Sequence, residues 1–296
     1  MDPRRLEMLL QLSRLGSMRE VAENLGTTTS TVSQQVAALA REVGTPLVEP
    51  VGRRVRLTPA GRRLADHAVT VLAALEEARL DLDPSAEPAG TVRVAAFATA
   101  VRRALLPAVA QLAERHPGVG LRIHEHEPAE ALQLLASDDV DLALTYDYDL
   151  APATFDPTVV TAPLGTAAWA LGVPAGVDGD VGTARAVVGR FREADWIVNS
   201  RNTADEEVVR ILASLAGFAP HVAHRADSLD LVQDMVAAGL GVGLLPADQP
   251  TIPQVALLPL HQPDVTLRAY AVTRRGRAAW PPLAAVLRLL EGATLT

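Results

Sequence analysis

The first 57 residues consist of short amphipathic segments separated by turn residues. Leucines spaced three and four residues apart, with glycines after them, predict three helices in succession. These helices are expected to end near residues 15, 25 and 43, with the third starting at 27–29. Two short strands are predicted at 47–48 and 55–57, on either side of the basic stretch Gly52-Arg53-Arg54. Helix, turn, helix and a basic hairpin form the outline of a winged helix-turn-helix, to which we assign residues 1–58.

Residues 59–82 carry a different pattern, in which apolar residues alternate at spacings of four and three. This is the spacing of a heptad seam. The seam comprises Leu64, Ala68, Val71, Leu75, Ala78 and Leu82. It covers fewer than three heptads and fits either a dimerising helix or a buried amphipathic one, and its place between two units of opposite charge favours dimerisation. Prolines and small polar residues at 83–90 predict a hinge, so we assign 59–90 to a linker helix and hinge.

Beyond residue 91, strand-like apolar runs alternate with amphipathic helices. This order predicts an α/β domain over residues 91–296 with mainly parallel sheets. Strands are expected at 91–97, 121–127, 141–146, 196–199, 221–225, 242–245 and 266–273, and helices at 104–115, 128–137, 203–216, 228–238 and 281–291. Because segments 127–145 and 227–246 share one pattern, we expect two similar lobes. Lobe 1 would comprise about 91–161 and 266–296, lobe 2 about 162–265, with a ligand cleft between them.

Composition narrows the class of protein. Hydrophobic residues make up 49% of the 296 residues and charged residues 21%, which is typical of a globular protein. The absence of cysteine excludes disulfides, thiolate metal sites and a cysteine nucleophile. The N-terminus is interrupted by charge too early for a signal-peptide core, and no stretch is long enough to span a membrane, so we expect a cytoplasmic protein with no membrane partner.

The net charge of −8 is unevenly distributed. Residues 1–63 contain ten arginines and six acidic residues, whereas residues 64–296 contain seventeen arginines and 29 acidic residues. Because attraction to phosphates is local on the scale of a Debye length, the basic N-terminal segment can bind DNA although the whole chain is acidic.

Two features are compatible with enzyme chemistry, but each has a plainer interpretation. The Gly239-Leu240-Gly241-Val242-Gly243 run leads from a helix into a strand, which is the reverse of a dinucleotide-binding turn. His124 and His126 share one face of a predicted strand, where solvated histidines are commoner than a metal site. No hydrolase elbow, zinc-protease motif or phosphate loop occurs. We therefore predict no enzyme activity, no catalytic residues, no cofactor and no metal.

Several segments together resemble the LysR-type transcriptional regulators. The N-terminal ones are 15–25 (LGSMREVAENL), 32–39 (VSQQVAAL), 43–47 (VGTPL) and 55–61 (VRLTPAG). The C-terminal ones are Leu105-Leu106-Pro107, His116-Pro117, Asp141-Leu142-Ala143-Leu144 and 239–246 (GLGVGLLP). The resemblance implies a winged helix-turn-helix, a dimerising linker helix and a two-lobed effector-binding domain similar to periplasmic binding proteins. It also implies dimers, often paired into tetramers, on interrupted palindromic DNA sites near a promoter, with RNA polymerase as a partner if the protein activates.

The third helix is expected to be the recognition helix. Its first two turns offer hydroxyl and amide groups to DNA: Thr28, Thr29, Ser30, Thr31, Ser33, Gln34 and Gln35. Ordinary helix capping is the alternative role for Thr28 or Thr29. The wing offers Arg53, Arg54 and Arg56 to phosphates or the minor groove, or else these are solvated charges. Thr29, Gln34, Ala40, Val48 and Pro50 depart from the usual family pattern, which affects the DNA sequence recognised more than the fold.

Effector-binding residues follow from the resemblance by position, at strand ends and helix N-termini. They are Ala98, Thr99, Ala100, Glu127, Pro128, Tyr146, Asn199, Ser200, Asn202, Asp227 and Ser228. Their polar groups suit an anion at a helix N-terminus, whereas Ala98 and Ala100 leave room for an apolar or aromatic effector. Capping and turn formation are the alternative roles of the polar residues.

Two other hypotheses stay open at this stage. The chain could be an α/β binding protein or enzyme whose N-terminal module only contacts protein, in which case residues 1–90 would bind no DNA. It could also be a regulator with a vestigial cleft, in which case no ligand would stabilise residues 91–296.

Overall fold

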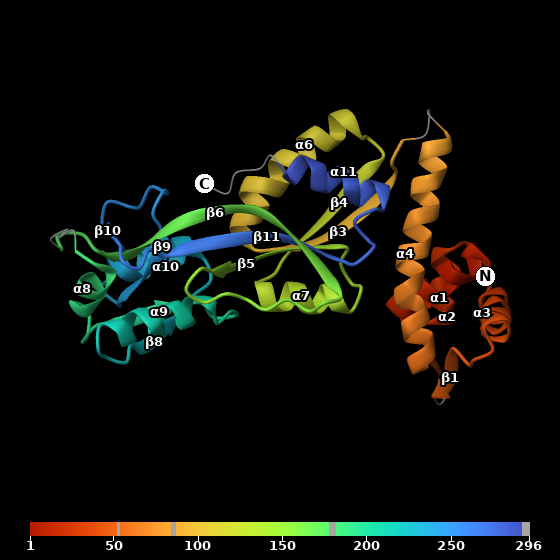
Figure 1. The fold of residues 1–296 in the computed structure, drawn as a ribbon, viewed down its shortest axis with the longest axis horizontal. Helices are drawn as coiled ribbons and strands as arrows, with labels where there is room; N and C mark the ends of the chain where they lie inside the picture. Colours follow the sequence, from red (N-terminus) through yellow and green to blue (C-terminus); the bar gives the residue numbers. More distant parts are fainter. Residues whose placement is uncertain (52–53, 84–86, 178–181, 292–296) are drawn as a thin grey trace.

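A computed structural model describes residues 1–51, 54–83, 87–177 and 182–291, and Figure 1 shows its fold. The N-terminal part comprises α1 (Pro3–Leu15), α2 (Met18–Asn24), α3 (Thr29–Val43), β1 (Val48–Val51), β2 (Arg54–Leu57) and α4 (Pro59–Leu82). β1 and β2 pair antiparallel, with Val48 opposite Leu57. The predicted winged helix-turn-helix and the long helix after it are confirmed.

Local side-chain hydrogen bonds define where these helices start. Asp2, Ser17 and Thr28 each accept a hydrogen bond from a backbone N–H two or three residues further on. Gly16 and Gly44 end α1 and α3 with φ of 67° and 70°, a conformation that glycine adopts without the Cβ penalty. The turns therefore follow from the sequence around them.

Helix α4 presents three different faces. Ala65, Ala68 and Val69 are buried against the apolar core that α1, α2 and α3 share. Asp66 and Thr70 contact the C-terminal domain through Arg274 and the carbonyl of Arg275. The third face carries most of the heptad seam, and α4 stands between the two domains (Figure 1).

The C-terminal part begins at β3 and ends at α11. Its elements are β3 (Gly90–Ala96), α5 (Ala98–Ala100), η1 (Val101–Leu105), α6 (Leu106–Arg115), β4 (Val119–Glu125), α7 (Pro128–Ala136), β5 (Leu142–Tyr148), β6 (Val159–Pro174), α8 (Ala184–Gly189), β7 (Asp195–Val198), α9 (Ala204–Leu215), β8 (His221–Arg225), α10 (Leu229–Ala237), β9 (Val242–Pro246), β10 (Val255–Pro259), β11 (Thr266–Arg274) and α11 (Pro281–Leu290). The described residues form a nine-stranded sheet in the order β4-β3-β5-β11-β6-β9-β7-β8, with β10 paired to β6.

Two parallel groups of strands are joined by two long antiparallel strands. In lobe 1, β3 is parallel to β4 and β5, and in lobe 2, β7 is parallel to β8 and β9. β6 pairs antiparallel with β11, β9 and β10, and β11 pairs antiparallel with β5. The tail returns to lobe 1 as predicted. The expectation of mainly parallel pairing is wrong, because β6 and β11 cross between the lobes in opposite directions.

Three elements were not predicted, and one starts earlier than expected. β6, α8 and β10 were missed, and the boundary predicted at residue 161 falls inside β6. The helical segment expected to begin at 104 begins at Ala98 and contains a π-helical turn, η1. β6 is stabilised by strands on both sides, so its own sequence needs no alternating pattern.

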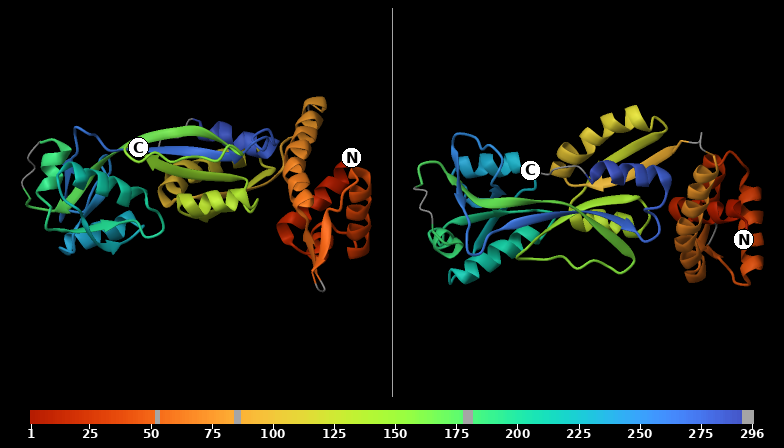
Figure 2. Two further views of the ribbon diagram at one scale, coloured as in Figure 1. Left: turned by 60° about the horizontal axis from the view of Figure 1, so that its bottom comes forward. Right: turned by 45° about the horizontal axis from the view of Figure 1, so that its top comes forward.

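Both faces of the lobe 1 sheet are covered by helices. Val94 and Leu144 face a core shared with α6 and α11, whereas their neighbours Ala95 and Ala143 face α7. This alternation follows from the two-residue period of a strand. Figure 2 shows lobe 1 beside α4 and lobe 2 at the far end of the molecule.

A buried group of charges joins the N-terminal domain to lobe 1. Asp138 is 5% exposed, with φ of 63°. Its carboxylate lies 2.6 Å from Arg14 Nε of α1 and 2.6 Å from Arg274 Nη2 of β11. Arg274 also lies 3.3 Å from Asp66 of α4. Docking of the winged helix-turn-helix therefore depends on charges from both domains.

Candidate effector cleft and DNA-binding surface

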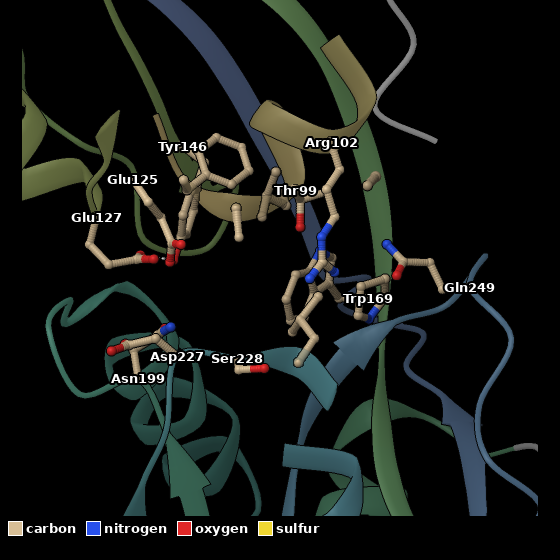
Figure 3. Close-up of a pocket in the computed structure, with 16 residues that line it drawn as sticks. Thr99, Arg102, Glu125, Glu127, Tyr146, Trp169, Asn199, Asp227, Ser228 and Gln249 are labelled. Carbon is tan, nitrogen blue, oxygen red and sulfur yellow. Dashed lines mark hydrogen bonds between the residues drawn. The ribbon is translucent and has the colours of Figure 1, made fainter. Parts of the chain in front are cut away.

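A cavity of about 170 Å³ lies between the lobes. Residues 97–99, at the end of β3, line it, as do residues at the ends of β4, β7 and β8. The parallel strands of both lobes thus direct their carboxyl ends at one cavity, where open α/β sheets commonly bind ligands. Figure 3 shows the cavity with its lining side chains.

Glu127 is the most deeply buried carboxylate in the cavity wall. It is 5% exposed and precedes α7, and the Tyr146 hydroxyl donates a hydrogen bond to it at 3.0 Å. Burial raises the pKa of Glu127 to about 7, and the Tyr146 hydrogen bond opposes that rise only in part. No ion pair to Glu127 is formed within the described part of the chain.

A second buried carboxylate, Asp205 of α9, lies behind the cavity. The Tyr148 hydroxyl donates to it at 2.7 Å. With its amide oriented so that the nitrogen donates, Asn199 Nδ2 lies 2.6 and 2.9 Å from the two Asp205 oxygens. Burial raises the pKa of Asp205 to about 6, against the opposing effect of the Tyr148 hydrogen bond. The predicted cleft residue Asn199 thus lines the cavity and also supports a buried acid.

Arg201 of lobe 2 bridges the two lobes at the edge of the cavity. Its guanidinium lies 3.0 Å from Asp227, 3.5 Å from Glu125 and 3.5 Å from Glu130. Asp227 also accepts hydrogen bonds from the backbone N–H groups of Ser200, at 2.8 Å, and Arg201, at 3.2 Å. One arginine is therefore shared by three carboxylates.

Aromatic rings form a continuous row beside these acids. Phe97 meets Tyr146 edge-on at 4.8 Å between ring centroids, Tyr146 meets Tyr148 at 6.1 Å, and Tyr148 meets Trp169 at 5.5 Å. Phe97, Tyr146 and Trp169 line the cavity. The wall is thus both aromatic and acidic.

Most of the predicted effector residues come together at this cavity. Its lining includes Ala98, Thr99, Glu127, Tyr146, Asn199, Asp227 and Ser228. The other four predicted residues lie outside the lining. Ala100 and Pro128 belong to buried helix faces, Ser200 contacts Asp227, and Asn202 Oδ1 accepts from the Ala204 N–H at 3.2 Å.

The cavity also contains residues that were not predicted. Phe97, Arg102, Glu125, Ala167, Trp169, Leu229, Pro246, Gln249 and Leu267 line it as well. Phe97 ends a predicted strand, so the rule that placed Thr99 and Glu127 at strand ends could have found it. Glu125 was missed because β4 ends at Glu125, two residues before the predicted end of that strand. Ala167 and Trp169 could not be found in this way, because they lie on the unpredicted β6.

The third helix exposes the groups predicted to contact DNA. Thr29, Ser30, Ser33 and Gln34 are exposed, whereas Val32 and the other inward residues of α3 are fully buried. In Figure 1, α3 lies on the side of the N-terminal domain away from the effector cleft. Its exposed face is therefore open to a DNA groove.

Thr28 and Thr31 have a local role in the structure. The Thr28 hydroxyl accepts from the Thr31 N–H at 3.2 Å and lies 2.8 Å from the Ser30 and Thr31 hydroxyls. Capping, the alternative considered for Thr28, therefore applies to it. Gln35 accepts from Arg5 Nε at 2.9 Å, which ties α3 to α1.

The structure describes two of the three wing arginines. The Arg56 guanidinium lies 2.7 Å from Glu49 across the hairpin, and both side chains are exposed. Arg54 begins β2, and Arg53 lies outside the described residues. Because an exposed ion pair contributes little, Arg56 can exchange Glu49 for a phosphate at small cost.

The heptad residues of α4 divide into buried and exposed members. Ala68 is fully buried in its own chain, because α4 packs on α1, so it is not available to a second copy. Leu64 packs partly against the same core. Val71, Leu75, Ala78 and Leu82 are exposed, Leu82 by 85%. An exposed apolar strip thus remains along one side of α4.

Within the described ranges, no three His, Cys, Asp or Glu side chains gather as a metal site. His126, just before α7, has its Nδ1 3.3 Å from Glu130 in the first turn of that helix. Among the helices of the described residues, none has the length and apolar character to cross a membrane.

Comparisons with known proteins decide the family. The LysR substrate binding domain matches residues 85–294, and the bacterial regulatory helix-turn-helix of the lysR family matches residues 3–62. The chain belongs to the LysR family. It is a transcriptional regulator with a DNA-binding N-terminal domain and an effector-binding C-terminal domain.

Individual relatives agree with this assignment. A probable hydrogen peroxide-inducible genes activator of Streptomyces viridosporus is 32% identical over 233 residues, covering 77% of this chain and 72% of the relative. A full-length variant of OxyR from Pseudomonas aeruginosa superposes with a TM-score of 0.72 at 19% identity, covering 100% and 96% of the two chains. CbnR in complex with its target DNA gives a TM-score of 0.53 at 18% identity, covering 98% and 99%.

Proposed function

We propose that this LysR-family regulator binds an interrupted palindromic operator as a dimer, and responds to a small molecule in the cavity between its lobes. The observation that carries this proposal is the joint presence of an exposed polar recognition helix and a lined cavity between the lobes in one chain. The protein would act by binding rather than by catalysis, and it would do so in the cytoplasm. We also propose that dimers pair into tetramers, and that the protein contacts RNA polymerase if it activates transcription.

This chain would sense its signal without a cysteine thiol. The Streptomyces relative bears the name of a peroxide-inducible activator. Since the present chain contains no cysteine, it cannot form a sulfenic acid or a disulfide. We therefore assign sensing to reversible binding in the cavity.

Replacing Ser33 with alanine, or Arg53 with alanine, should weaken operator binding by about fivefold to tenfold. Each change removes one hydrogen-bonding or charged group that the sequence predicts to contact DNA, and such a contact contributes about 1–1.5 kcal/mol. The measurement is fluorescence anisotropy with a duplex covering the region upstream of the protein's own gene. A salt titration of the unaltered protein should show a steep loss of affinity.

Ser214→Ala provides the matched control, because Ser214 is also an exposed helical serine but lies in α9 of lobe 2. It should bind the operator like the unaltered protein. Unchanged operator affinity in both Ser33→Ala and Arg53→Ala, with intact thermal unfolding, would contradict the proposed docking.

Replacing Leu75 with glutamate should convert the dimer into a monomer. The exposed apolar strip of α4 would then carry a charge that loses hydration when two copies pair. Sedimentation velocity at micromolar concentration measures the change. Operator affinity should fall with it, since a palindromic site is bound by two copies.

Glu77→Lys is the control for this change, because Glu77 is exposed on α4 and lies outside the strip. It should leave the sedimentation coefficient unchanged. A Leu75→Glu protein that still sediments as a dimer would place the dimer contact elsewhere.

A further inference from the structure

The cavity between the lobes carries an excess of negative charge. Glu125, Glu127 and Asp227 line it, and Arg102 is the cationic residue in its lining. Arg102 is exposed and lies 3.9 Å from Asp230, at the cavity mouth. Arg201 is already shared by Asp227, Glu125 and Glu130. The field within the cavity therefore favours a cation.

Glu127 is the acid whose charge is least compensated. It is 95% buried, and the Tyr146 hydroxyl donates a hydrogen bond to it at 3.0 Å. As the N-cap of α7, its side chain also takes part in a capping box with the Glu130 backbone N–H, but it forms no ion pair within the described residues. A buried carboxylate without a cation is unfavourable, and its pKa of about 7 reflects that cost. A ligand ammonium group would supply both the missing charge and N–H donors.

The aromatic rings of the cavity suit the same kind of ligand. Tyr146 donates to Glu127 and Phe97 packs against Tyr146, so two of the aromatic rings lie next to the acids, and aromatic faces attract organic cations. The volume of about 170 Å³ is close to the roughly 150 Å³ that holds a benzene molecule in an engineered cavity. One ring with a short side chain therefore fits.

A second, independent feature marks the opposite end of the cavity. Trp169 is 92% buried, and its Nε1–H has no hydrogen-bond partner within the described ranges. Figure 3 places Trp169 near Arg102 and Gln249, whereas Glu125 and Glu127 lie together on the other side. A buried indole N–H usually finds an acceptor. An indole that turns its buried Nε1–H toward the cavity would find this acceptor in a ligand oxygen at this end.

We infer that the effector is a small organic amine, with its ammonium group at Glu125 and Glu127, an aromatic or apolar body between the rings, and a hydrogen-bond acceptor near Trp169. This inference rests on the proposed function, because it names the chemical class bound at the proposed effector site. It replaces the anion expected from polar groups at helix N-termini, since the buried carboxylates repel an anion.

Three probes that differ in one group test this class. Tyramine, tyrosol and 4-hydroxyphenylacetate share the phenol ring and carry an ammonium, a hydroxyl and a carboxylate, respectively. Isothermal titration calorimetry on the full chain should give an affinity for tyramine at least about tenfold above the other two, because charge-assisted hydrogen bonds are about twice as strong as neutral ones. Equal or tighter binding of 4-hydroxyphenylacetate, or no tyramine binding at millimolar concentration, would overturn the inference.

Replacing Glu127 with glutamine tests whether this residue binds the ammonium group. Glutamine keeps the shape and can still accept from Tyr146, so the fold should persist, as tryptophan fluorescence on heating can verify. Tyramine affinity should fall about tenfold or more, and tyrosol affinity should stay within about twofold. Glu114→Gln, an exposed change in α6, should leave both affinities unaltered. A Glu127→Gln protein with unaltered tyramine affinity would contradict the assignment.

The pH dependence gives an independent readout. Glu127 attracts the ammonium group only in its ionised form. The affinity for tyramine should therefore rise in proportion to the ionised fraction of Glu127. With a pKa of about 7, tyramine should bind about tenfold more tightly at pH 8 than at pH 6. The Glu127→Gln protein should lose this dependence, and a profile that persists in it would count against the inference.

The outcomes separate this inference from the proposed function. Operator binding is measured without any amine. A protein that binds its operator but prefers the carboxylate probe retains the proposed function and loses only the inferred ligand class. A protein that binds tyramine but no DNA upstream of its gene loses the proposed function.

Discussion

Replacing Asp141 with asparagine should lower the free energy of unfolding of the effector-binding domain by about 3–5 kcal/mol, since this is the range for breaking a buried ion pair from one side. Asp141 is 2% exposed and comes directly before β5. Its carboxylate lies 3.0 Å from Arg93 Nε and 2.8 Å from Arg277 Nη2. The change would leave Arg277, 7% exposed, as a buried cation with less compensation.

Fluorescence on urea unfolding measures this loss. All three tryptophans lie in the effector-binding domain, and the Arg277 guanidinium lies over the Trp280 ring at 4.0 Å. The transition should move to lower urea concentration with little change in its slope. The exposed Asp234→Asn change in α10 should shift stability by no more than about 0.5 kcal/mol. Equal effects of the two changes would show that the charges around Asp141 are not what stabilises lobe 1.

The Asp141 carboxylate should also make the stability of the effector-binding domain depend on pH. Burial raises the pKa of Asp141, but hydrogen bonding from Arg93 and the charge of Arg277 outweigh it and hold the pKa at about 2. Since this folded-state pKa is lower than the ordinary value of about 3.9, the stabilisation by Asp141 is fully present above about pH 4 and is lost as the pH falls through 2. Asp141→Asn should therefore lose stability less steeply between pH 4 and pH 2.

Replacing Gly61 with alanine should destabilise the N-terminal domain by about 2 kcal/mol, and Gly61→Val should do so more severely. A Cβ at Gly61 would lie 2.1 Å from the carbonyl oxygen of Leu47. That oxygen accepts from the Thr58 N–H at 3.0 Å, so it cannot move away without breaking the turn into α4. The overlap costs about 3 kcal/mol, and the better helix propensity of alanine offsets about 1 kcal/mol.

Two spectroscopic signals separate this effect from damage elsewhere. Circular dichroism at 222 nm should show part of the helix signal melting at lower temperature, because α1 to α4 are helical. Tryptophan fluorescence should keep its midpoint, because it reports on the other domain. Operator affinity should disappear where the early transition occurs. An unchanged helix transition in Gly61→Val would refute the packing argument.

Gly189→Ala is the matched glycine control. Gly189 ends α8, and a Cβ there would meet only Ala216 Cβ, at 3.9 Å. This ordinary contact should leave stability the same or slightly higher. The contrast between the two glycines follows from what each one faces.

The N-terminal domain was predictable because its signals are local. Gly16 and Gly44 end helices where the sequence places them, and α4 covers residues 59–82 as predicted. Side chains within three residues of each helix start, such as Thr28, account for these ends. Local hydrogen bonds need no partner from elsewhere in the chain, so pattern and composition suffice.

The effector-binding domain was predictable only in part. β6 was missed because pairing with β11, β9 and β10 stabilises it, and Trp169 in the cavity wall was missed with it. The heptad pattern likewise could not separate Ala68, buried in its own chain, from exposed Leu75. In each case the deciding contact comes from a distant part of the chain.

The amino-acid sequence by itself determined the two-domain organisation, the recognition helix and the linker helix, because helical periods, caps and charge distribution are local properties. The strand-end positions of the cleft followed from the family resemblance. Tertiary structure decided the character of the cavity. Glu127 meets Tyr146, 19 residues away, and Arg201 lies beside Glu130, 71 residues away, and beside Glu125. Burial and these long-range neighbours, which no local pattern encodes, turn ordinary strand-end acids into a buried, acidic and aromatic site.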